Sequence, residues 1–157
     1  MSHHHIPTER FRTLALADVE NLLGDHRFDH HASWPAVLAP LLTSSARRHV
    51  VIATGPRLAL GAHLAYPAAR QLIGRGVNGA DLALLNSVND LDHVASRYQR
   101  LEIMSGDGIF TARAVAARHC GLEVTVTSRP EALAAELRRA ASSVCELSVA
   151  NALETVA

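Results

Sequence analysis

Hydrophobic residues recur along this chain in two patterns, as short unbroken runs and as longer segments with helical spacing. The runs predict buried strands, which fall at 11–17, 49–53, 101–104, 122–127 and, at an edge, 144–149. The helical spacing predicts helices, which fall at 33–42, 58–73, 81–97, 108–119 and 129–140. Strands that alternate with helices indicate right-handed crossovers and a parallel sheet covered on both faces. We therefore predict an α/β fold with three layers, α/β/α, around a central parallel sheet of about four to five strands.

Residues that cap or break helices refine these boundaries. Ser33 is expected to cap the first helix, and Asp81 stands where the N-cap of the third belongs. Pro67 is expected to kink or divide segment 58–73, because proline lacks a backbone donor. The glycine-rich segment 74–79 is the strongest loop signal in the chain.

Length and composition indicate one domain. The chain has 157 residues, 48% of them apolar, which suffices for a core without disulfides or structural metal. We predict a domain at 10–150, a leader at 1–9 and a tail at 151–157. Cys120 and Cys145 lack the spacing of a zinc or redox motif and are expected to be buried, reduced thiols. No run approaches the roughly 20 apolar residues of a membrane span, so a cytoplasmic protein without membrane association is expected.

Charge gives no global support for nucleic-acid binding. The 15 acidic residues are balanced by 15 basic ones, all of them arginine, so any electrostatic footprint has to be local. The guanidinium group of arginine presents its donors in a geometry that suits phosphate, although an arginine on a helix surface is more often merely solvated. The arginines that could follow a phosphate backbone are Arg47, Arg48, Arg113, Arg118, Arg138 and Arg139. With two tyrosines, three phenylalanines and one tryptophan, a broad base-stacking platform is not expected.

Acidic residues follow two of the predicted strands, and a third opens the helix that leads into the second of them. Asp18 comes directly after strand 11–17, Asp107 closely follows strand 101–104, and Asp81 begins the intervening helix. The carboxyl ends of parallel strands share one edge, where ligands bind. Carboxylates brought together there repel each other unless a cation lies between them. Mg²⁺ or Mn²⁺ is the ion usually bound at a site made of oxygen ligands. Each residue also has a structural interpretation, Asp18 and Asp107 as turn residues and Asp81 as a helix cap.

The neighbours of these acids carry further expectations. Gly106 and Gly108 flank Asp107, and we expect them to let a substrate phosphate or a hydrated metal approach the backbone. Glu20 is expected to lie outside the metal shell and to be solvated at the surface.

Histidines provide a second group of potential ligands. His26, Asp29 and His30 lie in a polar segment that reads as a loop. A solvated loop near the site is the plainer interpretation. A substrate-gating or leaving-group role for one histidine is the alternative.

Three segments carry a family resemblance. They are Asp18 to Leu22 (Asp-Val-Glu-Asn-Leu), Gly79 to Leu84 (Gly-Ala-Asp-Leu-Ala-Leu) and Ile103 to Phe110 (Ile-Met-Ser-Gly-Asp-Gly-Ile-Phe). Over about residues 11–140 the chain resembles the NYN domain of the PIN-like nuclease superfamily. In that family the first motif is Asp-x-x-Asn, the second has an Asp at a helix start, and the third is Ser-Gly-Asp-x-Asp-Phe.

The resemblance implies a PIN-like fold and a set of site residues. Asp18, Asn21, Asp81 and Asp107 take the catalytic positions, and the three aspartates among them take the metal positions. Ser105 is expected to orient its loop or to contact phosphate. With Ser105, the predicted substrate contacts are Arg47, Arg48 and Arg113.

This chain departs from the family pattern at two positions. The second motif of the family often carries another acid where this chain has Ser87, and the second Asp of the third motif is Ile109 here. A site with fewer acids would hold one weakly bound ion rather than a pair.

We predict a metal-dependent endoribonuclease that uses Mg²⁺ or Mn²⁺ to hydrolyse RNA phosphodiester bonds. The alternative is a non-catalytic or weakly active RNA-binding or scaffolding module with a degenerate metal site. A phosphatase or nucleotidase ranks third, because Asp18-x-Glu20 faintly resembles aspartyl-phosphate enzymes but the chain has no lysine. An exposed apolar helix face within 58–73 would favour a homodimer, and a further protein partner is left open.

Overall fold

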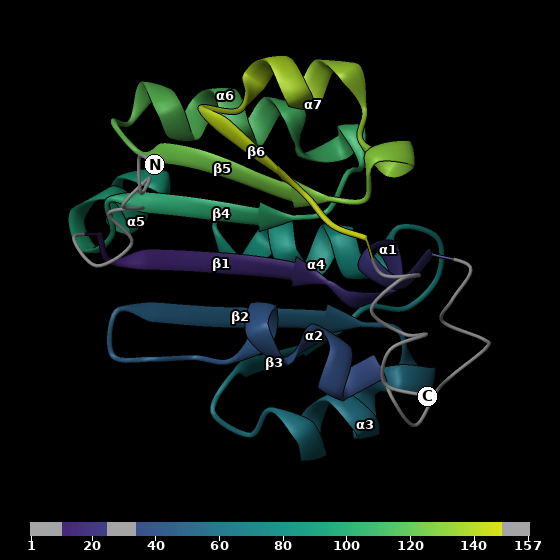
Figure 1. Ribbon diagram of the computed structural model, residues 1–157. Helices are drawn as coiled ribbons and strands as arrows, with labels where there is room; N and C mark the ends of the chain where they lie inside the picture. Colours follow the sequence, from purple (N-terminus) through teal and green to yellow (C-terminus); the bar gives the residue numbers. More distant parts are fainter. Residues whose placement is uncertain (1–10, 25–33, 149–157) are drawn as a thin grey trace, which may run out of the picture.

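The computed structural model describes residues 11–24 and 34–148, which form a six-stranded, all-parallel sheet (Figure 1). The strands are β1 (Thr13–Asp18), β2 (Arg48–Thr54), β3 (Arg70–Ile73), β4 (Arg100–Met104), β5 (Glu123–Ser128) and β6 (Ser143–Glu146). Their spatial order is β3-β2-β1-β4-β5-β6, and every neighbouring pair is parallel. The chain thus moves outward from β1 to β3, returns to place β4 beside β1, and moves outward again. Ligand sites of such sheets lie at the carboxyl ends of the two central strands, here β1 and β4.

Helices cover the two faces of the sheet and complete three layers. On one face lie α1 (Val19–Leu23), α2 (Trp34–Leu42) and α3 (Pro56–Ala65). On the other lie α4 (Gly79–Ser87), α5 (Leu91–Arg97), α6 (Thr111–His119) and α7 (Ala135–Ala140). Two short 3₁₀ turns, η2 (Gly108–Phe110) and η3 (Pro130–Ala132), precede α6 and α7. Figure 1 shows α2 in front of β2 and α4 behind β1.

Alternation along β1 explains why both faces are buried. Leu14 and Leu16 join the core under α4 to α7, whereas Ala15 and Ala17 join the core under α1 to α3. Successive side chains of a strand point to opposite faces, so an unbroken apolar run fits a strand that is covered on both sides. The predicted three-layer α/β/α architecture is confirmed.

The number of strands exceeds the prediction, because segment 58–73 does not form one helix. Its helix, α3, ends at Ala65, and residues 70–73 form β3, in which Arg70 lies opposite Val51 of β2. Pro67 therefore divides the segment rather than kinking it, as expected of a residue that cannot donate to a helix. A strand of four residues is too short to show a periodicity of its own.

Segment 81–97 is likewise two helices instead of the predicted one. The hydroxyl of Ser87 donates to the Leu84 carbonyl (2.7 Å) at the end of α4, and the side chain of Asp90 caps α5 by accepting from His93 N (2.9 Å). Since α4 begins at Gly79, Asp81 lies inside its first turn and is not its N-cap. The cap position belongs to Asn78, whose φ of 55° is left-handed.

The structure also bears on the predictions about the two cysteines and about membrane spans. Cys120 is half-buried and Cys145 is exposed on β6, so the expectation of two buried thiols was wrong. Within 11–24 and 34–148, no helix is long and apolar enough to cross a membrane. The predictions that fall outside the described residues are the leader 1–9, the tail 151–157, the loop with His26, Asp29 and His30, and the Ser33 cap.

At the carboxyl edge of the sheet, the backbone at Gly74 passes close to the backbone at Gly79. A Cβ added to Gly74 would lie 2.0 Å from the carbonyl carbon of Gly79, whereas one added to Gly61 within α3 would meet nothing closer than a Trp34 ring carbon at 3.5 Å. Gly74→Ala should therefore lower the free energy of unfolding by about 1–3 kcal/mol. Gly61→Ala should raise it by about 0.5–1 kcal/mol, because alanine favours a helix interior. Urea denaturation measures both, and equal stabilities would contradict the crossing.

Candidate functional site

A cavity of about 480 Å³ opens at the carboxyl edge of the sheet, where the segments that follow five strands meet. Its charged lining residues are Asp18, Glu20, Asp81, Asp107 and Arg129. Gly55, which follows β2, and three glycines of segment 74–79 line it as well. Asp18 ends β1 and Glu20 follows it, and one charged group each follows β3, β4 and β5. The sheet has thus gathered the three aspartates that the sequence singled out, from segments almost ninety residues apart.

Asp18 and Asp81 form a buried carboxyl pair. Their exposed fractions are 5% and 6%, and their side chains share a hydrogen bond. Burial, followed by the hydrogen bond and the charge of Asp81, raises the pKa of Asp18 from 3.8 to about 8. Burial, together with the nearby charge of Asp107, also raises the pKa of Asp81. Two buried carboxylates in contact repel each other, so near neutral pH the pair retains a proton unless a cation replaces it.

The polar partners of this pair leave room for a cation. Asp18 accepts from the backbone N–H of Asn21 (3.2 Å), but the Oδ1 atom of Asp81 is buried and has no hydrogen-bond partner in the part of the chain that the structure describes. Among the described residues, neither aspartate pairs with an arginine. A buried, unpartnered carboxylate oxygen beside a second carboxyl is a donor set that suits Mg²⁺ or Mn²⁺.

Asp107 lines the same cavity without joining the pair. Its carboxylate accepts from Ile109 N (2.9 Å) and caps η2, while its own N–H donates to the Ser105 hydroxyl (3.3 Å). Across the described part of the chain, no three acidic, histidine or cysteine side chains are close enough to form a metal-binding group. The predicted three-carboxylate shell is therefore only partly assembled, as two aspartates in contact and a third in the lining of the same cavity.

Asn21 and Ser105 hold the loops that carry the acids. The side-chain oxygen of Asn21 accepts from Gly106 N (2.9 Å), which ties α1 to the segment after β4. Ser105 is fully buried, so it orients the Asp107 loop and does not line the cavity. Of the two roles considered for Ser105, the structure supports loop orientation.

The glycines beside Asp107 make room for the protein rather than for a ligand. A Cβ on Gly106 would lie 2.3 Å from the Ala132 carbonyl oxygen, and one on Gly108 would lie 2.6 Å from a carboxylate oxygen of Glu136. The expectation that both glycines open the backbone to phosphate or metal was therefore wrong. They allow the segment after β4 to pack against the segments after β5.

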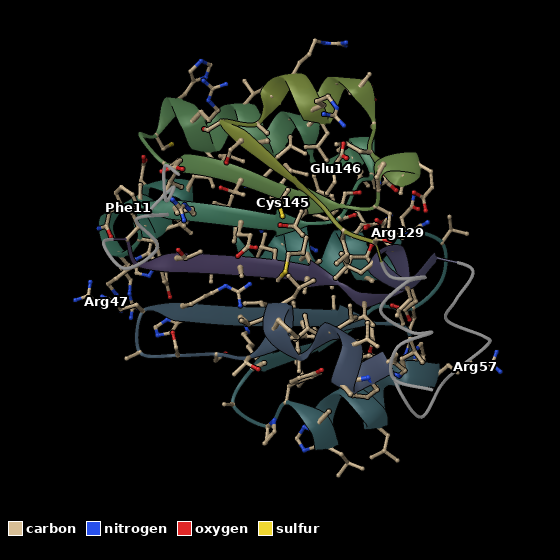
Figure 2. The ribbon with its side chains drawn as sticks, in the orientation of Figure 1. Phe11, Arg47, Arg57, Arg129, Cys145 and Glu146 are labelled. Carbon is tan, nitrogen blue, oxygen red and sulfur yellow. The ribbon has the colours of Figure 1, made fainter. Side chains whose placement is uncertain are left out.

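Sequence reasoning missed two residues of the cavity, Glu20 and Arg129. The strand does not continue past Asp18 but turns into α1, so Glu20 faces the cavity, where its Oε1 accepts from Gly55 N (2.6 Å). The Nε of Arg129 donates to the Asn21 carbonyl (3.1 Å), and its guanidinium also pairs with Glu131 (2.6 Å). Figure 2 shows Arg129 at the carboxyl ends of the central strands. The sequence does contain a signal for the position of Glu20. Asp18 is a favourable N-cap residue, which indicates that a helix begins directly after it.

The predicted arginine contacts lie elsewhere. Arg47 and Arg48 are at the amino end of β2, and Figure 2 shows Arg47 at the opposite edge of the sheet from Arg129. Arg48 is bonded to Glu102 through two donors (3.1 and 2.9 Å). Arg113 donates to the Val88 carbonyl (2.8 Å) and thereby ties α6 to the end of α4. None of these three arginines lines the carboxylate cavity, and their contact with a substrate stays a prediction.

Comparisons with known proteins bear on the fold. The sequence matches no protein-family profile and no curated protein. The structure is similar to the crystal structure of a protein of unknown function from Vibrio parahaemolyticus, with a TM-score of 0.64 and 13% identity. The match covers 91% of this chain and 97% of the other. At this identity, the similarity shows that the two proteins share the α/β fold.

The carboxyl pair gives a prediction on pH. Because the pKa of Asp18 is about 8 in the folded protein and 3.8 ordinarily, the folded state holds a proton that the unfolded chain releases between these values. The free energy of unfolding should therefore fall as the pH rises from about 4 to about 8.

Asp18→Asn keeps the shape and the acceptor oxygen but removes this titration. In EDTA at pH 8, the variant should have a higher free energy of unfolding than the wild type, as measured by urea denaturation. At pH 5 this difference should be smaller. Asp92→Asn, at an exposed position on α5, serves as the control. Parallel pH profiles for wild type and Asp18→Asn would contradict the shared proton.

Proposed function

We propose that this protein is a metal-dependent endoribonuclease that hydrolyses phosphodiester bonds of cytoplasmic RNA. The observation that carries the proposal is the buried pair of Asp18 and Asp81, with an unpartnered Oδ1, in a cavity at the carboxyl edge. This is the part of an open α/β sheet where ligands bind. The motif resemblance to the NYN domain supplies the substrate class.

Asp18 and Asp81 would hold Mg²⁺ or Mn²⁺, and Asp107 lines the same cavity. When bound, such an ion supplies Lewis-acid polarisation of a phosphate oxygen and a more acidic water. Asn21 keeps Asp18 in place through its N–H and holds the Asp107 loop through its side chain. Asp107 stays anchored by Ile109 N, so the loop presents it at one position.

Arg129 is the charged group of the cavity that suits the substrate. It is the one arginine among the described lining residues, and its Nε bond to the Asn21 carbonyl fixes its stem beside the acids. Its ion pair with Glu131 is partly solvated, since the Glu131 side chain is 68% exposed. A guanidinium in this position suits a phosphate oxygen of the RNA backbone.

A binding module without catalysis is the second proposal, and specific contacts favour it. Ser87, at a position where an acid is common in the family, bonds the Leu84 carbonyl, and Ile109 packs against the core. Neither side chain supports a second metal ion. The chain would then retain the cavity for RNA and cut it slowly or not at all.

A homodimer also remains a proposal. Leu60 and Leu64 lie four residues apart on α3 and are 69% and 70% exposed, and Ile73 on the edge strand β3 is 55% exposed. Residues four apart share one face of a helix. The apolar face expected within 58–73 is thus present, and it supports self-association.

RNA cleavage tests the catalytic proposal. With Mn²⁺ and labelled single-stranded RNA, the wild type should cut, and Asp18→Asn and Asp81→Asn should each lower the rate by roughly 100-fold or more, because even outer-shell changes at metal sites cost about 10–100-fold. Asp92→Asn is the charge-matched control and should cut like the wild type. Equal cutting by all four proteins would end the nuclease proposal, whereas RNA binding without cutting would favour the binding module.

Metal binding can be measured without activity. At pH 8, Mn²⁺ at about 100 times its dissociation constant should stabilise the folded wild type by about 2.7 kcal/mol. Asp81→Asn should lose most of this gain, because it removes the carboxylate with the unpartnered oxygen. Denaturation with Mn²⁺ and with EDTA gives the comparison. A gain in Asp81→Asn equal to that of the wild type would place the ion elsewhere.

Arg129→Gln separates phosphate recognition from metal binding. The variant should retain the Mn²⁺-dependent stabilisation and lose about tenfold in cleavage at subsaturating RNA, because a charge-assisted hydrogen bond is worth about 1.5–3 kcal/mol. Glu131→Gln, which leaves Arg129 in place, is the control. Unchanged cleavage by Arg129→Gln would remove this arginine from the substrate site.

A further inference from the structure

A second cavity lies at the other end of the strands, near their amino ends, and its lining is mainly positive where that of the first cavity is mainly negative. Its volume is about 660 Å³, and its charged lining residues are Arg47, Arg48, Arg100 and Glu102. Three guanidinium groups thus face one carboxylate. Pockets of this size bind small ligands.

The cavity opens on a part of the sheet that no described helix covers. On this face, α1, α2 and α3 pack over β1 to β3, and Figure 1 shows β4 and β5 with no helix in front of them. The sequence of these two strands alternates accordingly. Leu101, Ile103, Val124 and Val126 join the core behind, whereas Arg100, Glu102 and Thr125 occupy the open face. Parallel strands are usually apolar on both faces, so a polar face indicates one that meets water or a polar ligand.

Two of the arginines are fixed by the protein. Arg48 is held by Glu102 and by the Thr43 carbonyl, and these bonds fix its positive charge beside the cavity. Arg100 lies over the Phe11 ring at 5.1 Å and pairs with Glu123 at 3.1 Å. A guanidinium held in this way loses little freedom when it binds a ligand.

Arg100 also has an unmet hydrogen bond. Its Nε is buried and has no partner among residues 11–24 and 34–148, although buried N–H groups are nearly always bonded. Nearby, the Ser45 hydroxyl accepts from the backbone N–H groups of Arg47 and Arg48 (3.4 and 3.1 Å), so its own proton points elsewhere. Arg47 is exposed in the turn that leads into β2.

We propose that this cavity binds a phosphate group, with Arg100 as its anchor, Arg47 as a second cationic contact and Ser45 as a hydroxyl donor. Arginine matches the fork geometry of phosphate oxygens, and Arg48 adds a fixed positive charge behind them. The phosphate belongs to a small phosphate compound or to an RNA strand. The site is separated from the Asp18 pair by the length of β1, roughly 20 Å, so this proposal does not rest on the nuclease proposal.

Calorimetric titration with pyrophosphate in EDTA and low salt tests the site, because EDTA keeps the carboxylate cavity free of metal-bound phosphate. The wild type should bind pyrophosphate saturably. Arg100→Gln and Arg47→Gln should each weaken binding by roughly tenfold, the cost of one charge-assisted hydrogen bond. Arg139→Gln removes the same charge from an exposed position on α7 and should bind like the wild type. Circular dichroism checks folding, and Arg47→Gln decides the matter if Arg100→Gln does not fold.

Two oligoribonucleotides identify the source of the phosphate. Tighter binding of an oligomer with a 5′-phosphate than of its 5′-hydroxyl counterpart would identify a terminal phosphate of RNA. Equal binding of both, weakened by Arg47→Gln, would identify the RNA backbone. Binding of pyrophosphate alone would identify a small phosphate compound. The proposal is overturned if the wild type does not bind pyrophosphate, if both cavity variants bind it like the wild type, or if Arg139→Gln weakens binding equally.

Discussion

The contact between two buried carboxyl groups is the constraint around which the carboxyl edge of this protein is organised. Burial and mutual repulsion oppose the ionisation of Asp18 and Asp81, and the pKa of Asp18 rises to about 8. Two hydrogen bonds maintain this arrangement, since the Asp18 side chain accepts from Asn21 N as the cap of α1, and the Asn21 side chain accepts from Gly106 N and holds the Asp107 loop. A cavity that disfavours two negative charges but leaves a carboxylate oxygen unpartnered is suited to a cation.

Close packing of loops keeps the acids at fixed positions. Gly74 crosses the backbone of Gly79 on one side of the cavity, and Gly106 lies against the Ala132 carbonyl on another. Side chains larger than hydrogen do not fit at either crossing, so these glycines serve the packing of segments that follow different strands. The cavity is therefore built from backbone as much as from side chains, and its geometry depends on the loops being held together.

The two edges of the sheet carry opposite charge although the whole chain is neutral. Asp18 ends the central strand β1 and Asp107 follows the central strand β4, whereas Arg48 and Arg100 occupy the amino ends of β2 and β4. The register of the strands explains why the two arginines lie at the same end of the sheet, because Thr13 of β1 lies opposite both Arg48 and Arg100. A count of charges over the sequence cannot show this separation. It follows from parallel strands, which place all their starts at one edge and all their ends at the other.

Local pattern determined the main strands and the layers, because an apolar run identifies a buried strand without knowledge of its partners. The shared edge of parallel strands was also enough to place Asp18, Asp81 and Asp107 in one cavity. Tertiary structure decided the rest. Residues 70–73 became a strand by pairing with β2, Glu20 entered the cavity when the chain turned into α1, and Arg129 was fixed by a carbonyl 108 residues away. These outcomes depend on contacts between distant segments, and such contacts leave no periodicity in the sequence.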